Sequence, residues 1–415
     1  MIIYRTYFLK KWGWSFVRND NQGFARKINL KLAIVTSEFP PINAAASARI
    51  GPWVKELDSR GHKVSVFSSK GSAKIGNTQH FESNRSVPSN KVGIFRRFFQ
   101  EMRLAWDLSD MMKASLKQHD GVVITSPPFF LGTHIARLSQ KNNVPYIFDV
   151  RDRYPNVLFD LNVLSENSYI GRRLSRREEK CYRNSVLISS VTKGIDQEID
   201  SFQKPHEHIP NGFDGEIFDS DKYSKKDSVF RVVYHGRFSR LHDIESLREI
   251  SLRVQKVNPK IEFLIIGPIP EHVKNQDWGN VSFAGEKARS EIPALLSTGS
   301  IGISLMKVMN STKVAMPAKV YEYIGMGLPI LVAPEGELHD FVDTENVGLA
   351  FKKMDIIQIA ESLVTLEKNP ARYEQYKKQI HSVRTQFDRK NQSVIMADLI
   401  EKHFGSVDEK KVKFN

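Results

Sequence analysis

The sequence predicts an α/β protein made of two doubly wound, Rossmann-like domains. The length of 415 residues is more than a single compact core usually holds. Short apolar strands alternate with amphipathic helical stretches in both halves of the chain, and a polar linker at residues 219–227 separates the two sets. Ligands of such sheets bind outside the carboxyl ends of the strands. We therefore expect two sheets that face one another across an interdomain cleft.

The first predicted domain covers residues 30–215. It opens with a strand at 31–36, a loop up to Ala45, a helix over about 46–59 and a second strand at 63–67. This spacing fits a parallel strand–helix–strand crossover. Further buried strands are expected at 121–125, 145–149 and 185–191, with a helix around 131–141.

The second predicted domain covers residues 216–385 and repeats the alternation. Its strands are expected at 231–235, 261–267, 281–284, 301–305 and 329–333, with helices between them. The remaining residues, 386–415, are expected to form a helical tail that packs back on the N-terminal domain.

Charge and cysteine content limit the classes of protein to be considered. The excess of 61 Lys and Arg over 47 Asp and Glu gives a net charge of +14, which favours nucleic acid, an anionic membrane or a phosphorylated small molecule as partner. The single cysteine, Cys181, excludes an internal disulfide framework and a cysteine metal cluster, and fits a reducing cytosol. No apolar run reaches the roughly 18 to 20 residues that span a bilayer. We expect a cytoplasmic protein, with peripheral contact to the inner face of the membrane.

Residues 1–29 combine basic side chains with Trp12, Trp14 and other aromatic residues. The interspersed charges argue against a cleavable signal peptide or a spanning helix. A basic, tryptophan-rich segment suits the interface of a membrane, and packing against its own domain explains the same pattern. Both interpretations stay open.

The most informative stretch of the chain is residues 316–333. Glu322 lies in a short predicted helix that ends at a Gly-x-Gly-x-Pro step. Gly325 and Gly327 would let the backbone leave the helix, and Pro329 would prevent the helix from resuming. A carboxylate held there can accept hydrogen bonds from two neighbouring ribose hydroxyls. An exposed helical Glu before an ordinary turn is the alternative.

The loop over residues 37–49 is rich in small residues, Ala45 among them, and leads into a helix. Small side chains let backbone N–H groups approach an anion at a helix N-terminus. No Gly-x-Gly-x-x-Gly follows the first strand, and no Gly-x-x-x-x-Gly-Lys-Ser/Thr occurs in the chain. The standard dinucleotide and P-loop motifs are therefore absent.

Four motifs in order carry a family resemblance. They are the loop at 37–49, Ile-Pro-Asn-Gly-Phe-Asp at 209–214, Tyr-His-Gly-Arg-Phe-Ser at 234–239, and the Glu322 stretch. Together they resemble the family 4 retaining glycosyltransferases of the GT-B fold, from about residue 31 to 385. The Arg-Asp-x-x-Pro step within residues 148–155 looks like a branch that builds surface polysaccharides. The resemblance implies transfer of a sugar from a UDP- or GDP-linked donor to a saccharide or lipid-linked acceptor, without a metal or other cofactor.

The resemblance assigns the donor's diphosphate to Arg237, whose guanidinium can grip two phosphate oxygens and stabilise the charge on the leaving nucleotide. The family usually has a Lys five residues later, where this chain has His242. Arg240 is near enough to take over that half of the clamp. A surface Arg at the start of a loop is the alternative for Arg237.

Glu322 matches the second acid of the family's Glu-x7-Glu pattern and is expected to bind the donor ribose. The position of the first acid is occupied by Val314. Its contacts to the sugar would come from Lys319 or from the backbone around Pro317. An ion pair with Glu322 on the same helix face is the simpler explanation of Lys319.

In the N-terminal domain the resemblance points to Asp152, which would orient the acceptor or a sugar hydroxyl. Arg151 stands where many relatives have a His, and it cannot act as a base because its guanidinium stays protonated. A structural role of Asp152 as a helix or turn cap is equally compatible with the sequence.

Basic stretches at 96–106 and 172–177 belong to the half that receives the acceptor in this fold. They suggest a docking face for a lipid-linked acceptor at an anionic membrane, although most charge runs are simply solvated helix surfaces. No RNA-recognition module accompanies the charge, so nucleic acid is not expected as a partner. A GT-B sugar-nucleotide epimerase and a non-catalytic basic scaffold remain as alternative functions.

Overall fold

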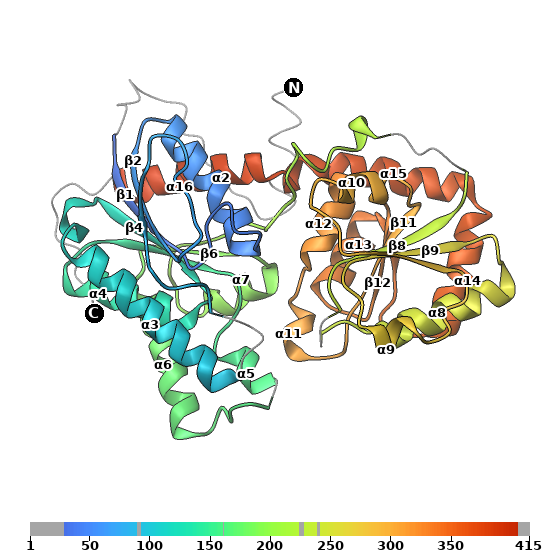
Figure 1. Ribbon diagram of the computed structural model, residues 1–415, viewed down its shortest axis with the longest axis horizontal. Coiled ribbons are helices and arrows are strands. Elements are labelled where there is room, and N and C mark those ends of the chain that lie inside the picture. The colour runs from blue at the N-terminus through green and yellow to red at the C-terminus, as the bar shows by residue number, and fades with distance from the viewer. Residues whose placement is uncertain (1–28, 89–92, 161, 224–227, 239–240, 406–415) are drawn as a thin grey trace.

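The computed structural model describes residues 29–88, 93–160, 162–223, 228–238 and 241–405. Figure 1 shows two lobes, each a sheet covered by helices on both faces. Every strand pair recorded within the two sheets is parallel, as expected for doubly wound α/β domains. The basic aromatic segment predicted at 1–29 lies, up to residue 28, outside the described residues.

The N-terminal lobe contains a seven-stranded sheet with the order β3-β2-β1-β4-β5-β6-β7. Its strands are β1 (Lys31–Val35), β2 (Lys63–Ser68), β3 (Gln79–Glu82), β4 (Gly121–Ser126), β5 (Tyr146–Val150), β6 (Leu187–Ser190) and β7 (His206–His208). Its helices are α2 (Ala45–Ser59), α3 (Ile94–Lys113), α4 (Phe129–Lys141), α5 (Asn156–Asp160), α6 (Tyr169–Asn184) and α7 (Lys193–Asp200), with a 3-10 turn at Leu116–Gln118.

The C-terminal lobe contains a six-stranded sheet with the order β10-β9-β8-β11-β12-β13. Its strands are β8 (Arg231–His235), β9 (Glu262–Ile266), β10 (Val281–Gly285), β11 (Ile301–Leu305), β12 (Ile330–Ala333) and β13 (Gly348–Ala350). Its helices are α8 (Ile244–Val257), α9 (Glu271–Lys274), α10 (Ile292–Leu296), α11 (Asn310–Lys313), α12 (Ala318–Gly325), α13 (Glu337–Glu345), α14 (Ile356–Glu367) and α15 (Pro370–Arg384). Short 3-10 turns cover Ser220–Lys222 and Thr385–Phe387.

The central strands are almost wholly buried because helices cover both faces of each sheet. This burial explains why they read as continuous apolar runs in the sequence. The three strands β3, β7 and β13, which the sequence analysis did not predict, each form an edge of a sheet. They are short, and β3 and β7 are polar, so neither length nor apolar pattern distinguishes them from loops.

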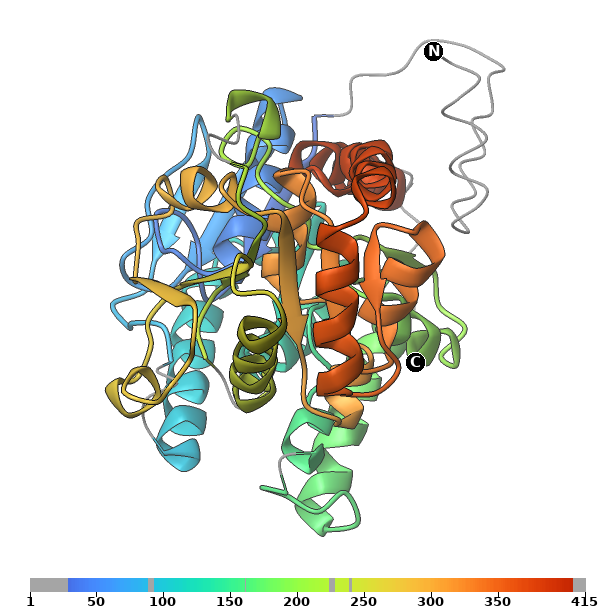
Figure 2. The ribbon, with the colours of Figure 1, turned by 90° about the vertical axis from the view of Figure 1, so that its right-hand side faces the viewer.

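The last helix, α16 (Arg389–Gly405), crosses from the C-terminal lobe to the N-terminal lobe and packs against α2. Arg60 at the end of α2 forms ion pairs with Asp398 at 2.7 Å and with Glu401 at 3.2 Å. In Figure 2, turned by 90°, α16 is seen nearly end-on near the top of the view. The chain thus begins and ends its described part on the same lobe.

The two segments that connect the lobes run beside each other. Phe213 N–H donates to the Phe387 carbonyl at 2.8 Å, and Arg389 N–H donates to the Phe213 carbonyl at 2.9 Å. Gly212 has a φ of +64°, and a Cβ there would lie 2.4 Å from the Phe387 oxygen. A glycine is therefore required at the point where the first connecting segment contacts the second.

Candidate active site

Glycines shape the carboxyl edge of the C-terminal sheet. Gly236 follows β8 with a φ of +124°, and Gly267 follows β9 with a φ of +142°. A Cβ on Gly267 would come within 2.3 Å of the Gly236 carbonyl oxygen. Only glycine permits this close approach of the two strand ends, so neither position carries a side chain at this edge.

Glu322 lies beside this edge, buried on α12, with two basic groups around its carboxylate. His235 Nδ1 is 2.7 Å from one carboxylate oxygen. Arg289 Nη1, from the segment after β10, is 3.7 Å from the other. Glu322 is therefore held in the interior of the lobe and not on an exposed helix face, which favours the functional interpretation over the alternative of a surface Glu.

Gly325 and Gly327 differ in their roles at the end of this helix. Gly327 has a φ of +65° and supplies the left-handed backbone that the sequence predicted. Gly325 is the last helical residue and has no positive φ. A glycine is needed at this position because a Cβ there would lie 2.7 Å from the Phe213 ring. The prediction that Gly325 lets the backbone leave the helix was therefore wrong, and the reason for glycine is packing.

Lys319 lies one turn before Glu322, with its side chain buried beneath Gly236. Its Nζ is 3.9 Å from the centroid of the Tyr234 ring. A Cβ on Gly236 would be 3.4 Å from the Lys319 Cε. Burial lowers the pKa of Lys319 well below its usual value, while the Glu322 carboxylate acts in the opposite direction. Among the ion pairs of the described residues, none within 4.0 Å joins Lys319 to Glu322, so the simple pairing considered from the sequence is not what the structure shows.

Arg237 lies at the rim of the same edge, directly after Gly236. Its side chain is 79% exposed, and a guanidinium nitrogen is 3.6 Å from the Glu286 carboxylate. An exposed pair at this distance contributes little to stability. The guanidinium can therefore exchange Glu286 for another anion at low cost.

His242 sits deeper in the lobe, where its ring packs edge-on against Tyr234 with the centroids 6.1 Å apart. Burial, helped by the charge of Lys319, lowers the pKa of His242 to about 3. The imidazole is therefore neutral at pH 7 and can offer a hydrogen bond but no positive charge. Arg240, the predicted substitute, lies outside the described residues.

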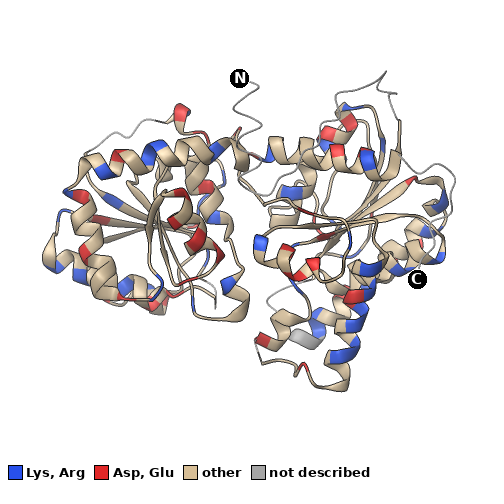
Figure 3. Cartoon of the chain, turned by 180° about the vertical axis from the view of Figure 1, so that it is seen from behind, with Lys and Arg blue, Asp and Glu red and all other residues tan. Residues whose placement is uncertain are grey.

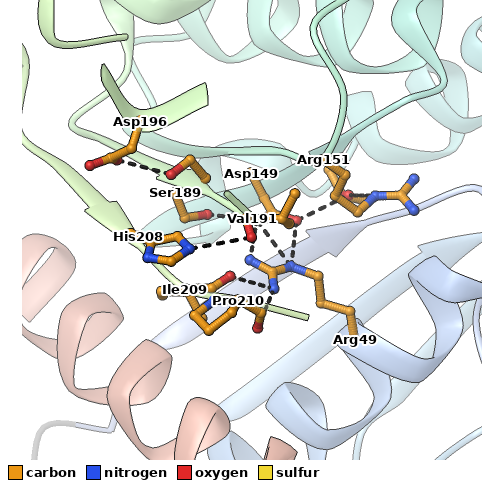
Figure 4. Close-up of polar contacts among 11 residues, drawn as sticks. Arg49, Asp149, Arg151, Ser189, Val191, Asp196, His208, Ile209 and Pro210 are labelled. Atoms are coloured by element: carbon orange, nitrogen blue, oxygen red, sulfur yellow. Dashed lines mark hydrogen bonds and ion pairs between the residues drawn. The ribbon is translucent and has the colours of Figure 1, made fainter. Parts of the chain in front are cut away.

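The N-terminal sheet presents a polar network at its own carboxyl edge (Figure 4). Asp149 on β5 is fully buried and binds Arg49 of α2, with a shortest distance of 2.9 Å. Ser189 donates a hydrogen bond to the same carboxylate at 2.7 Å, and Thr125 does so at 3.3 Å. Arg49 also donates to the carbonyls of Ile209 at 2.8 Å and Pro210 at 3.2 Å, just before the first crossing. The network thus ties the sheet, α2 and the connecting segment together.

Arg151 and Asp152 follow β5 beyond this network. Arg151 Nε donates to the Thr125 hydroxyl at 3.0 Å, and its terminal nitrogen binds the Pro127 carbonyl. Asp152 is exposed at the surface, yet the protein around it displaces water from its carboxyl, and this desolvation raises the pKa of the carboxyl. The positive charges of Arg151 and Arg97 oppose the shift. An accessible carboxylate in such surroundings can contact a substrate. Ala45 is the exposed first residue of α2.

The two lobes meet through side chains from these same edges. Glu337, the first residue of α13, accepts hydrogen bonds from the backbone N–H groups of Lys193 at 2.7 Å and Gly194 at 2.8 Å. Both amides belong to the N-terminus of α7 in the other lobe, where a carboxylate is favoured by the helix dipole. Nearby, a pocket is lined by Phe159, Asp160 and Asn162 on one side and by Val308, Met309 and Asn310 on the other.

The structure brings Glu322, Lys319, Pro317 and the Gly236–Arg237 turn to one region of the C-terminal lobe. Asp152 and Ala45 belong to the other lobe. His235 and Arg289 were not selected from the sequence, although both approach Glu322. The position of His235 directly before the Gly-Arg step was the available signal, whereas nothing in the sequence distinguished Arg289.

Two kinds of feature are missing from the described residues. Among them, no three His, Cys, Asp or Glu side chains come together as a set of metal ligands. None of the helices in the described ranges combines the length and apolar character needed to cross a bilayer.

Comparisons with known proteins agree with this architecture. Residues 53–216 match the model of the family described as Glycosyltransferase Family 4, and residues 229–369 match that described as Glycosyl transferases group 1. None of the curated proteins compared with the chain matches it.

Solved structures share the fold at low sequence identity. Sucrose-phosphate synthase from Thermosynechococcus elongatus has a TM-score of 0.67 and 14% identity, covering 91% of this chain and 100% of that one. HepE from Anabaena, in complex with UDP-glucose, has a TM-score of 0.62 and 13% identity, covering 90% and 100%. WaaG, a glycosyltransferase involved in lipopolysaccharide biosynthesis, has a TM-score of 0.63 and 12% identity, covering 89% and 99%. With both matched domains in order on this fold, the chain is a glycosyltransferase of the GT-B type, built from a family 4 N-terminal domain and a group 1 C-terminal domain.

Proposed function

We propose that this enzyme transfers a sugar from a nucleotide diphosphate donor to a saccharide, with retention of the anomeric configuration. The donor carries UDP or GDP, and the acceptor is a saccharide or lipid-linked saccharide in the synthesis of a surface polysaccharide. HepE, which shares the fold, was solved with UDP and with UDP-glucose, and this supports a nucleotide sugar as the donor here.

The observation that carries the proposal is the arrangement around Glu322. The carboxylate is held between His235 and Arg289 at one edge of the C-terminal sheet, and Arg237 lies at the rim of the same edge. Glu322 would accept hydrogen bonds from the ribose hydroxyls. Arg237 would bind the diphosphate of the same nucleotide, where its guanidinium can form two parallel hydrogen bonds.

Lys319 and the backbone at Pro317 would face the sugar or the phosphate next to it. The Lys319 amine lies directly beneath Gly236, and Gly236 carries no side chain that would separate it from a ligand at this edge. His242 would add a neutral hydrogen bond, since its imidazole carries no charge at pH 7. Ala45 would contribute the backbone at the start of α2 from the opposite lobe.

The proposed chemistry is a front-face substitution in which the departing diphosphate accepts the proton of the acceptor hydroxyl. The protein then has no nucleophile to supply. Its contribution is to position both substrates and to stabilise the charge that develops on the diphosphate. The cationic side chains of the chain would supply this stabilisation, so the proposal requires no metal ion.

Asp152 would orient the acceptor or a sugar hydroxyl from the N-terminal lobe. Its carboxylate is accessible, and Arg151 beside it is held by Thr125 and Pro127. A cytoplasmic enzyme of this kind would meet a lipid-linked acceptor at the inner face of the membrane.

Product analysis by NMR tests the proposal. Purified enzyme is incubated with a panel of UDP- and GDP-sugars, with and without saccharide acceptors, and the anomeric configuration of each product is read from its proton couplings. The expected result is a glycoside with the configuration of the donor, formed only when acceptor is present.

Three outcomes would contradict it. An inverted glycoside would refute retention, and isomerised donor in the absence of acceptor would identify an epimerase. Failure of every nucleotide and nucleotide sugar to bind in calorimetry would point to a non-catalytic scaffold. The matched variants are Arg237→Ala, expected to reduce turnover strongly, and Glu335→Ala, an exposed acid after β12 that is expected to leave it unchanged.

A further inference from the structure

The outer face of the N-terminal lobe carries basic and aromatic side chains on three adjacent helices. Contacts link α3 to α4 and α4 to α6. Trp106 on α3 donates from Nε1 to His134 Nε2 on α4 at 3.2 Å. Arg177 on α6 lies 3.1 Å from the other nitrogen of the same imidazole. A continuous row of contacts, Trp106–His134–Arg177, therefore crosses all three helices, and we call the surface around it the α3–α4–α6 face.

Cations without acidic partners are concentrated on this face. Burial lowers the pKa of Arg177, and the positive charges of the neighbouring Arg137 and Arg173 lower it further. Within the described part of the chain, no carboxylate forms an ion pair with Arg137, Arg173 or Arg177. Figure 3 shows Lys and Arg gathered along α6. Three guanidinium groups that repel one another are stabilised by an anion placed among them.

The spacing along α6 brings further cations to the same side. Arg173, Arg176, Arg177 and Lys180 recur at intervals of three or four residues, while Glu178 and Tyr182 on the opposite side are buried. Glu178 is turned inward, where it binds Arg153 at 3.5 Å and accepts a hydrogen bond from the Tyr154 N–H at 3.0 Å. Glu179, which is only partly buried, is the one other acid of α6, so the side that carries these four cations is strongly basic.

Large apolar side chains project from the same helices. Tyr169 and Ile170 in the first turn of α6 are 71% and 58% exposed. On α3, Phe99 is 47% exposed and Trp106 is 50% exposed. Arg103 lies over the Phe99 ring at 4.4 Å, which keeps the charge and the aromatic ring on one side of α3. Asp110, further along this helix, is paired with Lys113 at 2.5 Å.

We propose that the α3–α4–α6 face docks on an anionic phospholipid bilayer, with lipid phosphates bound among Arg137, Arg173 and Arg177. The flanking Trp106, Tyr169 and Ile170 enter the interface between headgroups and acyl chains. Exposed aromatic and aliphatic side chains beside clustered cations suit such an interface, because the acyl chains surround the apolar side chains while the lipid phosphates bind the cations. Nucleic acid would satisfy the charges but would leave Ile170 without a partner. The docking concerns a surface outside the substrate site, and it does not depend on the proposed transfer reaction.

Vesicle binding of the full-length protein tests the proposal. Sedimentation is measured with vesicles of phosphatidylcholine alone and of phosphatidylcholine with phosphatidylglycerol. The test variant is Arg137→Gln/Arg173→Gln. The matched control is Lys256→Gln/Lys378→Gln, which removes the same net charge from exposed positions on α8 and α15 of the other lobe. Circular dichroism and calorimetry with UDP and GDP check that each variant is folded.

The wild type is expected to bind the anionic vesicles and not the neutral ones. Each cation near a membrane surface contributes about a fivefold gain in affinity, so the test variant should bind about thirty-fold more weakly. The control should bind like the wild type. Equal losses in both variants would refute a specific face, as would unchanged binding of the test variant. Sequence-independent RNA binding that is lost in the test variant, without vesicle binding by the wild type, would assign the face to nucleic acid instead.

Insertion of the aromatic groups has its own measurement. Tryptophan emission is recorded with anionic vesicles whose acyl chains carry bromine, which quenches tryptophan on contact. Quenching in the wild type should exceed that in Trp106→Phe, because this conservative change removes one fluorophore from the face. Identical quenching in the two proteins would show that Trp106 does not reach the acyl chains.

Discussion

Replacing Asp149 by Asn should destabilise the N-terminal lobe far more than the loss of a single hydrogen bond. The carboxylate is fully buried and binds Arg49, Ser189 and Thr125 (Figure 4). Asn keeps the volume but removes the charge, and this leaves the buried Arg49 guanidinium without its counter-ion. Breaking a buried ion pair from one side costs about 3 to 5 kcal/mol. Arg49 keeps the carbonyls of Ile209 and Pro210, so a loss near the lower end, about 3 kcal/mol, is expected.

The assay is guanidinium denaturation followed by circular dichroism, arranged as a double-mutant cycle with Arg49→Met. Removing both partners should cost clearly less than the sum of the two single changes, because no buried charge remains. Asp398→Asn is the control, since its ion pair with Arg60 is half-exposed and should contribute less than about 1 kcal/mol. A loss below about 1 kcal/mol for Asp149→Asn, or full additivity in the cycle, would refute this account of the network.

Three further predictions concern pH, the contact between lobes and the N-terminal segment. Burial lowers the pKa of His208 to about 4, against about 6.5 in the unfolded chain, so the unfolded state binds more protons between these values. Stability should therefore fall as the pH drops from about 6.5 to 4, by up to about 1.4 kcal/mol per pH unit, and His208→Gln should flatten the profile of denaturation midpoint against pH. In Glu337→Gln the side chain accepts the two hydrogen bonds from the α7 amides more weakly, so the radius of gyration in small-angle scattering should rise. The control Glu335→Gln should leave this radius unchanged. Equal radii in both variants would contradict a role of Glu337 in holding the two lobes together. Deletion of residues 1–29 should shift part of the membrane-bound protein to the soluble fraction, since the α3–α4–α6 face is retained, and unchanged fractionation would show that this segment does not bind membrane.

The alternation of strands and helices was predictable because helices cover both faces of each sheet. Burial of this kind requires continuous apolar strands, which a sequence displays directly. The edge strands β3 and β7 could not be recognised, since they are only 4 and 3 residues long and need no apolar pattern. Gly325 shows a different limit. Its glycine is required by the Phe213 ring, which belongs to a distant segment of the chain.

The candidate site was predictable where residues follow one another in the chain and not where distant segments meet. Glu322 and the Gly236–Arg237 turn were selected from local motifs. The contacts of Glu322 with His235 and Arg289 depend on how β8, α12 and the segment after β10 are arranged in space. The low pKa of His242 likewise follows from its burial in the folded lobe and cannot be inferred from its place in the sequence.

The most direct test is whether Glu322 binds the ribose. Calorimetry compares UDP or GDP, whichever binds, with its 2′,3′-dideoxy analogue, for the wild type, Glu322→Ala and the control Glu335→Ala. Hydrogen bonds to a charged group contribute about 1.5 to 3 kcal/mol, so the wild type and control should prefer the natural nucleotide by at least about tenfold. Glu322→Ala should bind both nucleotides equally. An undiminished preference in a folded Glu322→Ala protein would show that another group holds the ribose.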